Sequence, residues 1–146
     1  MTAFPSTCSS RTFKIGEVYL MRFDGSAHVQ KGWRPGIVFQ NDIGNLHSPN
    51  IIALPLTTSL KKMNMPTHVL VKAEETGLKY DSMVLAENPR CLSKEEVGAY
   101  ITTLPASVMR DVALAHLKAT SALSYLQLHE LLDVWQQTIN MNSKVS

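Results

Sequence analysis

The stretch Gly32-Trp33-Arg34-Pro35 leads into the apolar run Gly36-Ile37-Val38-Phe39 and then into Gln40-Asn41-Asp42. The apolar run predicts a strand, and the polar residues after it predict a turn. Arginine keeps its charge near neutral pH, while the adjacent proline fixes the backbone and the upstream glycine gives it freedom. The stretch therefore predicts a guanidinium held where a strand begins, a place suited to binding a phosphate.

Short strand-like runs lie on both sides of this stretch. The expected strands are residues 16–23, 35–40, 50–56, 68–72, 82–86 and 98–104. Residues 50–56 are almost continuously apolar, which predicts a buried central strand, although Pro55 weakens that expectation. Residues 41–49, 59–66 and 74–80 are rich in turn and loop formers. Because no connection is long enough for a helical crossover, the pattern predicts an antiparallel, barrel-like sheet.

The periodicity becomes helical after Pro105. One face of the first helix carries Val108, Val112, Ala115 and Ala119. A second amphipathic helix is indicated by the stripe Leu128, Leu131, Leu132, Trp135 and Ile139. We expect this stripe to pack on the protein's own barrel or on a second copy, with binding to another partner left open. The fold class is therefore expected to be mainly β with C-terminal helices.

Composition limits the class of protein. The chain has 146 residues with 45% hydrophobic content, which is enough for one compact domain. Cys8 and Cys91 lie far apart without metal-ligand spacing, so neither a disulfide framework nor a metal site is expected, and a reducing cytoplasm fits. No signal peptide is apparent in residues 1–10, and no segment approaches the roughly 18 apolar residues of a membrane span.

The charge is unevenly distributed along the chain. Residues 1–72 hold eight Lys and Arg against three Asp and Glu, whereas residues 73–146 hold six against nine. This bias fits a local basic groove for a short anionic strand, and the modest net charge of +2 argues against a protein that coats duplexes. An evenly solvated surface explains the charge equally well.

Several motifs together resemble a known family. They are Gly16-Glu17-Val18-Tyr19, Trp33-Arg34-Pro35, Gln40-Asn41-Asp42-Ile43-Gly44-Asn45, Ser48-Pro49, Pro66-Thr67-His68-Val69 and Asp81-Ser82-Met83-Val84-Leu85. Their order and spacing are similar to those of the MazF/PemK (Kid) toxins. The resemblance implies an SH3-like antiparallel β-barrel of the CcdB/MazF type. It divides the chain into a flexible leader (1–13), a toxin domain (14–120) and an appended C-terminal helix (121–146).

The resemblance also implies an activity. MazF-like toxins are cytoplasmic, sequence-selective endoribonucleases that cleave single-stranded RNA, including mRNA, without a metal or cofactor. They act as homodimers and are neutralised by an antitoxin protein. The family's catalytic arginine and threonine are matched here by Arg34 and Thr57, with the adjacent Thr58 as an alternative if the register slips.

The chemistry explains why these residue types suit the reaction. The 2′-hydroxyl of the RNA attacks phosphorus, so no protein nucleophile is needed, but the charge on the phosphorane must be stabilised. Arg34 can give two charge-assisted hydrogen bonds to the phosphate, and Thr57 can add a short one from a rigid strand end. The alternatives are a surface ion pair of Arg34 with Asp24 or Glu87, and a Thr57 that merely ends a strand.

Ten residues are candidates for binding RNA. Ser26, His28, Gln30 and Lys31 lie in a loop expected to shape the RNA groove, and Thr58, Lys61 and Lys62 follow Thr57. Trp33 can stack on a base or cover the barrel. The last two, Glu87 and Asn88, stand in Glu87-Asn88-Pro89-Arg90, where the family usually has Glu-Gln-Ile-Arg. Glu87 can orient an arginine or form a strand-end salt bridge, and the lysines can be merely solvated.

Three histidines bear on proton transfer. His28 and His47 lie in expected loops on either side of Arg34, and histidine is suited to acid and base chemistry near neutral pH. The alternative for both is an exposed loop residue. His68 follows Thr67 at the start of an expected strand, so we expect it to be packed or hydrogen-bonded there.

Two other functions stay open at this point. The same fold includes CcdB-like toxins that bind DNA gyrase through the protein surface, for which Arg34 and Thr57 need not be catalytic. A catalytically inactive, antitoxin-binding relative is the other alternative, favoured by the altered loops and the additional helix.

Overall fold

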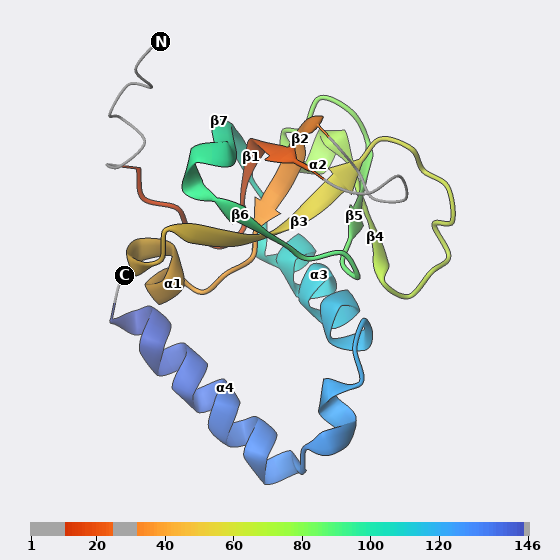
Figure 1. The fold of residues 1–146 in the computed structure, drawn as a ribbon. Coiled ribbons are helices and arrows are strands. Elements are labelled where there is room, and N and C mark those ends of the chain that lie inside the picture. The colour runs from red at the N-terminus through yellow and green to blue at the C-terminus, as the bar shows by residue number, and fades with distance from the viewer. Residues whose placement is uncertain (1–10, 25–31, 145–146) are drawn as a thin grey trace.

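The structure is a computed structural model that describes residues 11–24 and 32–144. Its strands form an antiparallel sheet in the order β4-β5-β3-β2-β1-β7, with β6 pairing with β3 (Figure 1). They are β1 (Glu17–Phe23), β2 (Gly32–Val38), β3 (Asn50–Thr57), β4 (His68–Val71), β5 (Ser82–Leu85), β6 (Arg90–Ser93) and β7 (Val97–Thr103). The predicted mainly β, barrel-like fold is confirmed, although the sheet is not closed over the described residues. Strand β6 was not predicted.

Strand β3 is central, as predicted. It pairs with β2 along one edge, while its other edge pairs first with β6 through residues 50–53 and then with β5 through residues 56–57. Pro55 lies between these two partners, where the sheet splits. A residue without a backbone N–H is tolerated more easily at such an interruption than inside a continuous ladder.

The sheet has a buried core on each face. Because successive residues of a strand point to opposite faces, Val38 and Ile37 in β2 belong to different cores. The first core includes Met21, Phe23 and Ile51. The second is covered by helix α3 (Ala106–Lys118), which contributes the fully buried Val112 (Figure 1). The helix starting after Pro105 is therefore confirmed, with Val112 and Ala115 as its buried face.

Two segments expected to be turns contain short helices. Helix α1 (Asp42–His47) begins where the Asn41 side chain accepts a hydrogen bond from the Gly44 amide at 2.8 Å. Helix α2 (Ala73–Thr76) ends at Gly77, whose φ of 81° is the left-handed conformation that glycine tolerates. The turn-forming residues therefore act here as helix caps. Single-turn 3₁₀ helices, η2 (Lys94–Glu96) and η3 (Ala122–Tyr125), complete the connections.

The second predicted helix exists as α4 (Leu128–Ser143), but the barrel does not cover its apolar stripe. Leu128 is 72% exposed and Trp135 is 62% exposed. Figure 1 shows α4 running apart from the sheet and returning to α1 near its C-terminal end, where the Asn142 side chain accepts a hydrogen bond from the Asp42 amide at 3.3 Å. The expectation that the stripe packs on its own barrel was wrong for these residues. None of the described helices is long and apolar enough to cross a membrane.

Candidate active site

Arg34 and Thr57 lie on neighbouring strands of the sheet. The register pairs Gly36 in β2 with Pro55 in β3. The pairing ends there, and continuing the same register by two residues would bring Arg34 opposite Thr57. Cross-strand partners point to the same face of a sheet, and so do residues two apart on one strand. Both side chains therefore belong to the face of the first core, where Arg34 also pairs with Met21 of β1.

Thr57 ends β3 with a positioned hydroxyl. Its Oγ1 accepts a hydrogen bond from the Ser59 amide at 3.1 Å, and the residue is 6% exposed. A hydroxyl that accepts from a backbone amide still has its own hydrogen to donate. Thr58, the alternative from sequence, is exposed. The geometry thus distinguishes a buried, oriented hydroxyl at Thr57 from a solvated one at Thr58.

Arg34 is half-buried near the start of β2, two residues into the strand. The two carboxylates considered as its ion-pair partners each have a contact with another residue. The Asp24 carboxylate lies 3.6 Å from Arg22, and the Glu87 carboxylate lies 2.6 Å from the His68 imidazole. A half-buried guanidinium is screened less than a surface one, so its attraction for a phosphate is stronger.

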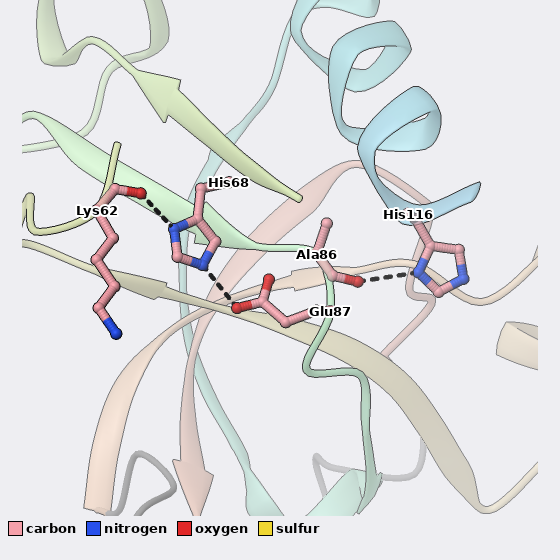
Figure 2. Close-up of polar contacts among 5 residues, drawn as sticks. All are labelled: Lys62, His68, Ala86, Glu87 and His116. Carbon is pink, nitrogen blue, oxygen red and sulfur yellow. Dashed lines mark hydrogen bonds and ion pairs between the residues drawn. The ribbon is translucent and has the colours of Figure 1, made fainter. Parts of the chain in front are cut away.

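His68 joins the loop after β3 to the turn after β5. Its side chain is 8% exposed; Nδ1 lies 2.9 Å from the Lys62 carbonyl oxygen and Nε2 lies 2.6 Å from Glu87 Oε1 (Figure 2). The expectation of a packed, hydrogen-bonded strand residue is confirmed. Glu87 therefore contacts His68, a partner that the sequence did not indicate.

The turn after β5 carries Asn88, and two further contacts fix its surroundings. His116 Nδ1 of α3 lies 3.1 Å from the Ala86 carbonyl oxygen (Figure 2). Arg90 donates a hydrogen bond to the Asp24 carbonyl, which brings the end of β1 to the start of β6. Asn88 itself is half-buried.

Lys61 and Lys62 lie in the exposed β3–β4 loop (residues 58–67), directly after Thr57. Lys62 has a φ of 58° and is the one non-glycine residue with positive φ in the described part of the chain. This left-handed conformation costs an ordinary side chain about 1 kcal/mol or more, so local contacts must hold it. The loop therefore adopts a defined turn next to Thr57.

Trp33 and His47 are not brought to Arg34. Trp33 is 54% exposed and points to the opposite face, where a Cβ on Gly98 of β7 would lie 3.2 Å from its ring. This supports the interpretation that Trp33 covers the barrel. His47 ends α1, before β3 begins, while Thr57 ends β3, roughly 23 Å along the strand. His47 is exposed, which agrees with the alternative of an exposed residue, although it ends a helix and does not lie in a loop.

Four predicted RNA-binding residues, Ser26, His28, Gln30 and Lys31, lie outside the described residues. Over residues 11–24 and 32–144, no three His, Cys, Asp or Glu side chains gather as a metal site would require. The described site consists of one guanidinium, threonine hydroxyls, lysines and the His68 pair. Such groups bind and orient a phosphodiester through hydrogen bonds and charge.

Comparison with known proteins gives consistent matches. Residues 14–119 match the family model described as PemK-like, MazF-like toxin of type II toxin-antitoxin system. Endoribonuclease EndoA of Bacillus subtilis (strain 168) is 40% identical over 100 residues, covering 68% of this chain and 86% of EndoA. Endoribonuclease MazF of Staphylococcus epidermidis is 36% identical over 98 residues, covering 66% and 82%.

Solved structures share the fold. MazF from Deinococcus radiodurans superposes with a TM-score of 0.65 at 22% identity, covering 80% of this chain and 100% of that one. A mycobacterial endoribonuclease in complex with its cognate antitoxin has a TM-score of 0.58 at 25% identity, covering 73% and 92%. All of α4 falls beyond the residues that the family model matches.

Proposed function

The chain belongs to the PemK-like, MazF-like toxins of type II toxin-antitoxin systems, and from this membership we propose that it is a sequence-selective endoribonuclease. Its substrate is single-stranded RNA, including mRNA, and its site of action is the cytoplasm. The observation that supports the proposal is the strand register, by which Arg34 in β2 and Thr57 in β3 belong to one face of the sheet.

The reaction needs no protein nucleophile. The 2′-oxygen of the RNA forms a bond to phosphorus as the bond from phosphorus to the 5′-oxygen breaks. The 2′-hydroxyl loses its proton, the 5′-oxygen gains one, and the products are a 2′,3′-cyclic phosphate and a 5′-hydroxyl. This chemistry requires that the attacking oxygen be aligned with phosphorus and that the charge of the phosphorane be stabilised.

Arg34 and Thr57 supply that stabilisation. The Arg34 guanidinium stays protonated, so it acts as a donor of two parallel hydrogen bonds to the non-bridging oxygens and not as a base. The Thr57 hydroxyl, oriented by the Ser59 amide, donates its hydrogen toward the same phosphate. Lys61 and Lys62 on the adjoining loop bind phosphates on either side of the scissile one.

Two partners follow from the family membership. A cognate antitoxin is proposed to bind and neutralise the protein, by analogy with the mycobacterial endoribonuclease that forms a complex with its own cognate antitoxin. A homodimer is proposed as the active assembly. Residues 1–13 are proposed as the leader, 14–120 as the toxin domain and 121–146 as an appendage to it.

The test is cleavage of a mixed-sequence transcript by the purified chain in EDTA, with the cut ends mapped by sequencing. Arg34→Ala should lower the cleavage rate about 10²- to 10³-fold while the protein stays folded. Arg110→Ala is the matched control, because Arg110 is an exposed arginine on α3, with its guanidinium 3.9 Å from Asp111. Absence of cutting by the wild-type protein, together with co-purification of DNA gyrase, would replace this proposal with a CcdB-like function.

A further inference from the structure

His68 connects the β3–β4 loop and the start of β4 to the turn after β5, which is distant in the sequence. It begins β4, and its imidazole touches the Lys62 carbonyl in the β3–β4 loop and the Glu87 carboxylate in the turn after β5 (Figure 2). Figure 2 shows the Lys62 side chain pointing away from the ring, so the contact is made by its backbone. The His68 side chain is only 8% exposed, and both of its ring nitrogens contact other residues.

The donors and acceptors of His68, Lys62 and Glu87 determine where the hydrogens of these contacts lie. A carbonyl oxygen only accepts, so Nδ1 must carry a hydrogen toward Lys62. An ionised carboxylate also only accepts, so the contact between Nε2 and Oε1 at 2.6 Å requires one more proton, on either His68 or Glu87. The bridge is therefore either a charge-assisted pair of imidazolium and carboxylate or a neutral pair in which the protonated acid donates, and the first form is the stronger.

The contact at Lys62 falls where the loop is strained. The Lys62 carbonyl accepts from His68 Nδ1 and, at 3.3 Å, from the Met65 amide, and its residue has the positive φ of 58°. Residues 58–66 are all exposed, so few packing contacts hold this turn. A residue keeps a strained backbone conformation only where the surrounding contacts hold it there. His68 provides a buried side-chain contact that holds Lys62 in its conformation.

The bridge also lies on the face that carries the candidate active site. His68 pairs with Leu85 in β5, and Met83, two residues earlier in β5, pairs with Thr57. By the same alternation used for Arg34, the side chains of His68 and Thr57 point to one face. The loop that His68 holds starts from Thr57 and carries Thr58, Lys61 and Lys62.

We infer that His68, paired with Glu87, is a positioning residue that holds the β3–β4 loop in the conformation that binds RNA. This inference rests on the proposed function, since it assigns the loop to the RNA-binding surface. Thr57 is anchored by its pairing with Met83, and the Ser59 amide that orients its hydroxyl is only two residues away, so the loop can loosen around Lys62 while the hydroxyl stays in place. Loss of the bridge therefore raises KM for RNA more than it lowers kcat.

The experiment compares wild-type protein with His68→Ala, Glu87→Ala, the double variant and Glu87→Gln. Hydrogen exchange of peptides covering residues 58–68 measures the loop directly. In His68→Ala we expect exchange about tenfold faster there, as loss of one charge-assisted hydrogen bond predicts. An oligoribonucleotide carrying the mapped cut site should show KM raised about tenfold, with kcat changed less than about twofold.

Glu87→Gln is the conservative variant. Its amide can donate to Nε2 while Nδ1 donates to Lys62, so the bridge survives without the extra proton and loop exchange stays near wild type. In a double-mutant cycle, His68→Ala with Glu87→Ala should cost no more in KM than His68→Ala alone, because Glu87 acts on the loop through His68. If the increases in KM of the two single variants combined fully in the double variant, the pairing of His68 with Glu87 would be overturned.

His116→Gln is the matched control, because His116 holds the same turn from α3 through Ala86 without contacting the loop. Exchange of residues 58–68 should stay unchanged in this variant, and equal acceleration would mean general loosening and overturn the inference. Unchanged loop exchange in His68→Ala would also overturn it. Failure of the wild-type protein to cut RNA would contradict the proposed function. Hydrogen exchange of residues 58–68 tests the contact between His68 and the loop whether or not the protein cuts RNA.

Discussion

The hydroxyl of Thr57 accepts a hydrogen bond from the amide of Ser59 at 3.1 Å. This contact orients the hydroxyl from the end of a paired strand, and it leaves the hydroxyl hydrogen available to a ligand. The side chain is almost completely buried, so little of it is open to solvent. This relationship separates Thr57 from its exposed neighbour Thr58.

Thr57→Val should lower the RNA cleavage rate about 10²-fold, because valine keeps the shape and removes the donor. Thr57→Ser should stay within about tenfold of wild type, because serine keeps the hydroxyl. Rates on the mapped oligoribonucleotide measure both. Thr58→Val is the control and should leave the rate near wild type; a larger loss there than at Thr57 would assign the hydroxyl to Thr58.

Arg34→Lys should lower kcat nearly as much as Arg34→Ala. An ammonium keeps the charge, but it is a point donor that cannot form the two parallel hydrogen bonds of a guanidinium. Single-turnover cleavage at saturating protein separates this loss from weaker binding. Recovery of most of the rate in Arg34→Lys would mean that charge alone accounts for the effect of Arg34.

Gly36→Ala should destabilise the fold by about 1 to 3 kcal/mol. A Cβ at this position would lie 2.7 Å from Met21 Sδ and 2.8 Å from the ring tip of Phe23, and both side chains are fully buried. Urea unfolding measures the change. Ala99→Gly, at an exposed strand position, is the control for backbone effects; equal stability of Gly36→Ala and wild type would contradict the tight packing.

Tyr19 predicts a loss of stability at high pH. Burial, followed by the nearby Glu17 carboxylate, raises the pKa of Tyr19 from 10.0 to about 12. Below pH 10 both folded and unfolded chains keep the phenol proton. Between pH 10 and 12 only the unfolded chain loses it, so the free energy of unfolding falls, by up to about 3 kcal/mol.

Denaturant unfolding at pH 8 to 12 measures this decline. Tyr19→Phe removes the titrating group, and the decline that it contributes should disappear in that variant. Tyr125→Phe is the control, since Tyr125 is 86% exposed and should leave the pH dependence unchanged. An identical alkaline decline in Tyr19→Phe and wild type would contradict the assignment.

Removal of residues 121–146 should leave the barrel folded and able to cleave RNA. The helix α4 touches α1 near its end, while its apolar residues are largely exposed. We expect an unfolding midpoint close to wild type and weaker binding of an apolar dye. A truncated chain that fails to fold would show that α4 belongs to the core of the domain.

Much of the fold was predictable because periodicity and turn residues encode it locally. The central strand β3 and helix α3 follow from apolar patterns that span whole elements. Strand β6 did not follow, since Arg90–Ser93 has only two apolar residues between polar ends and exists through pairing with β3. The short helix α1 depends on the Asn41 side chain, which caps it. The same side chain can equally stabilise a turn, so the sequence did not distinguish a short helix from a turn here.

The candidate site likewise has a part that the sequence predicted and a part that it did not. Arg34 and Thr57 are found by motif, and their common face follows once the register is known. The partnership of His68 and Glu87 could not be read from the sequence, because the residues are nineteen apart and meet only when β4 pairs with β5. For α4, amphipathic periodicity predicted the helix, but it could not predict which surface covers the apolar stripe.

The antiparallel pairing of β2 with β3 has a consequence for how such a protein can vary. A slip of one residue would set Leu56 or Thr58 across from Arg34 and turn every side chain of one strand toward the wrong core. Insertions in the exposed loop after Thr57 change reach and selectivity while preserving this frame. A single insertion or deletion inside either strand separates the guanidinium from the hydroxyl, so the chemistry tolerates change beside the strands and not within them.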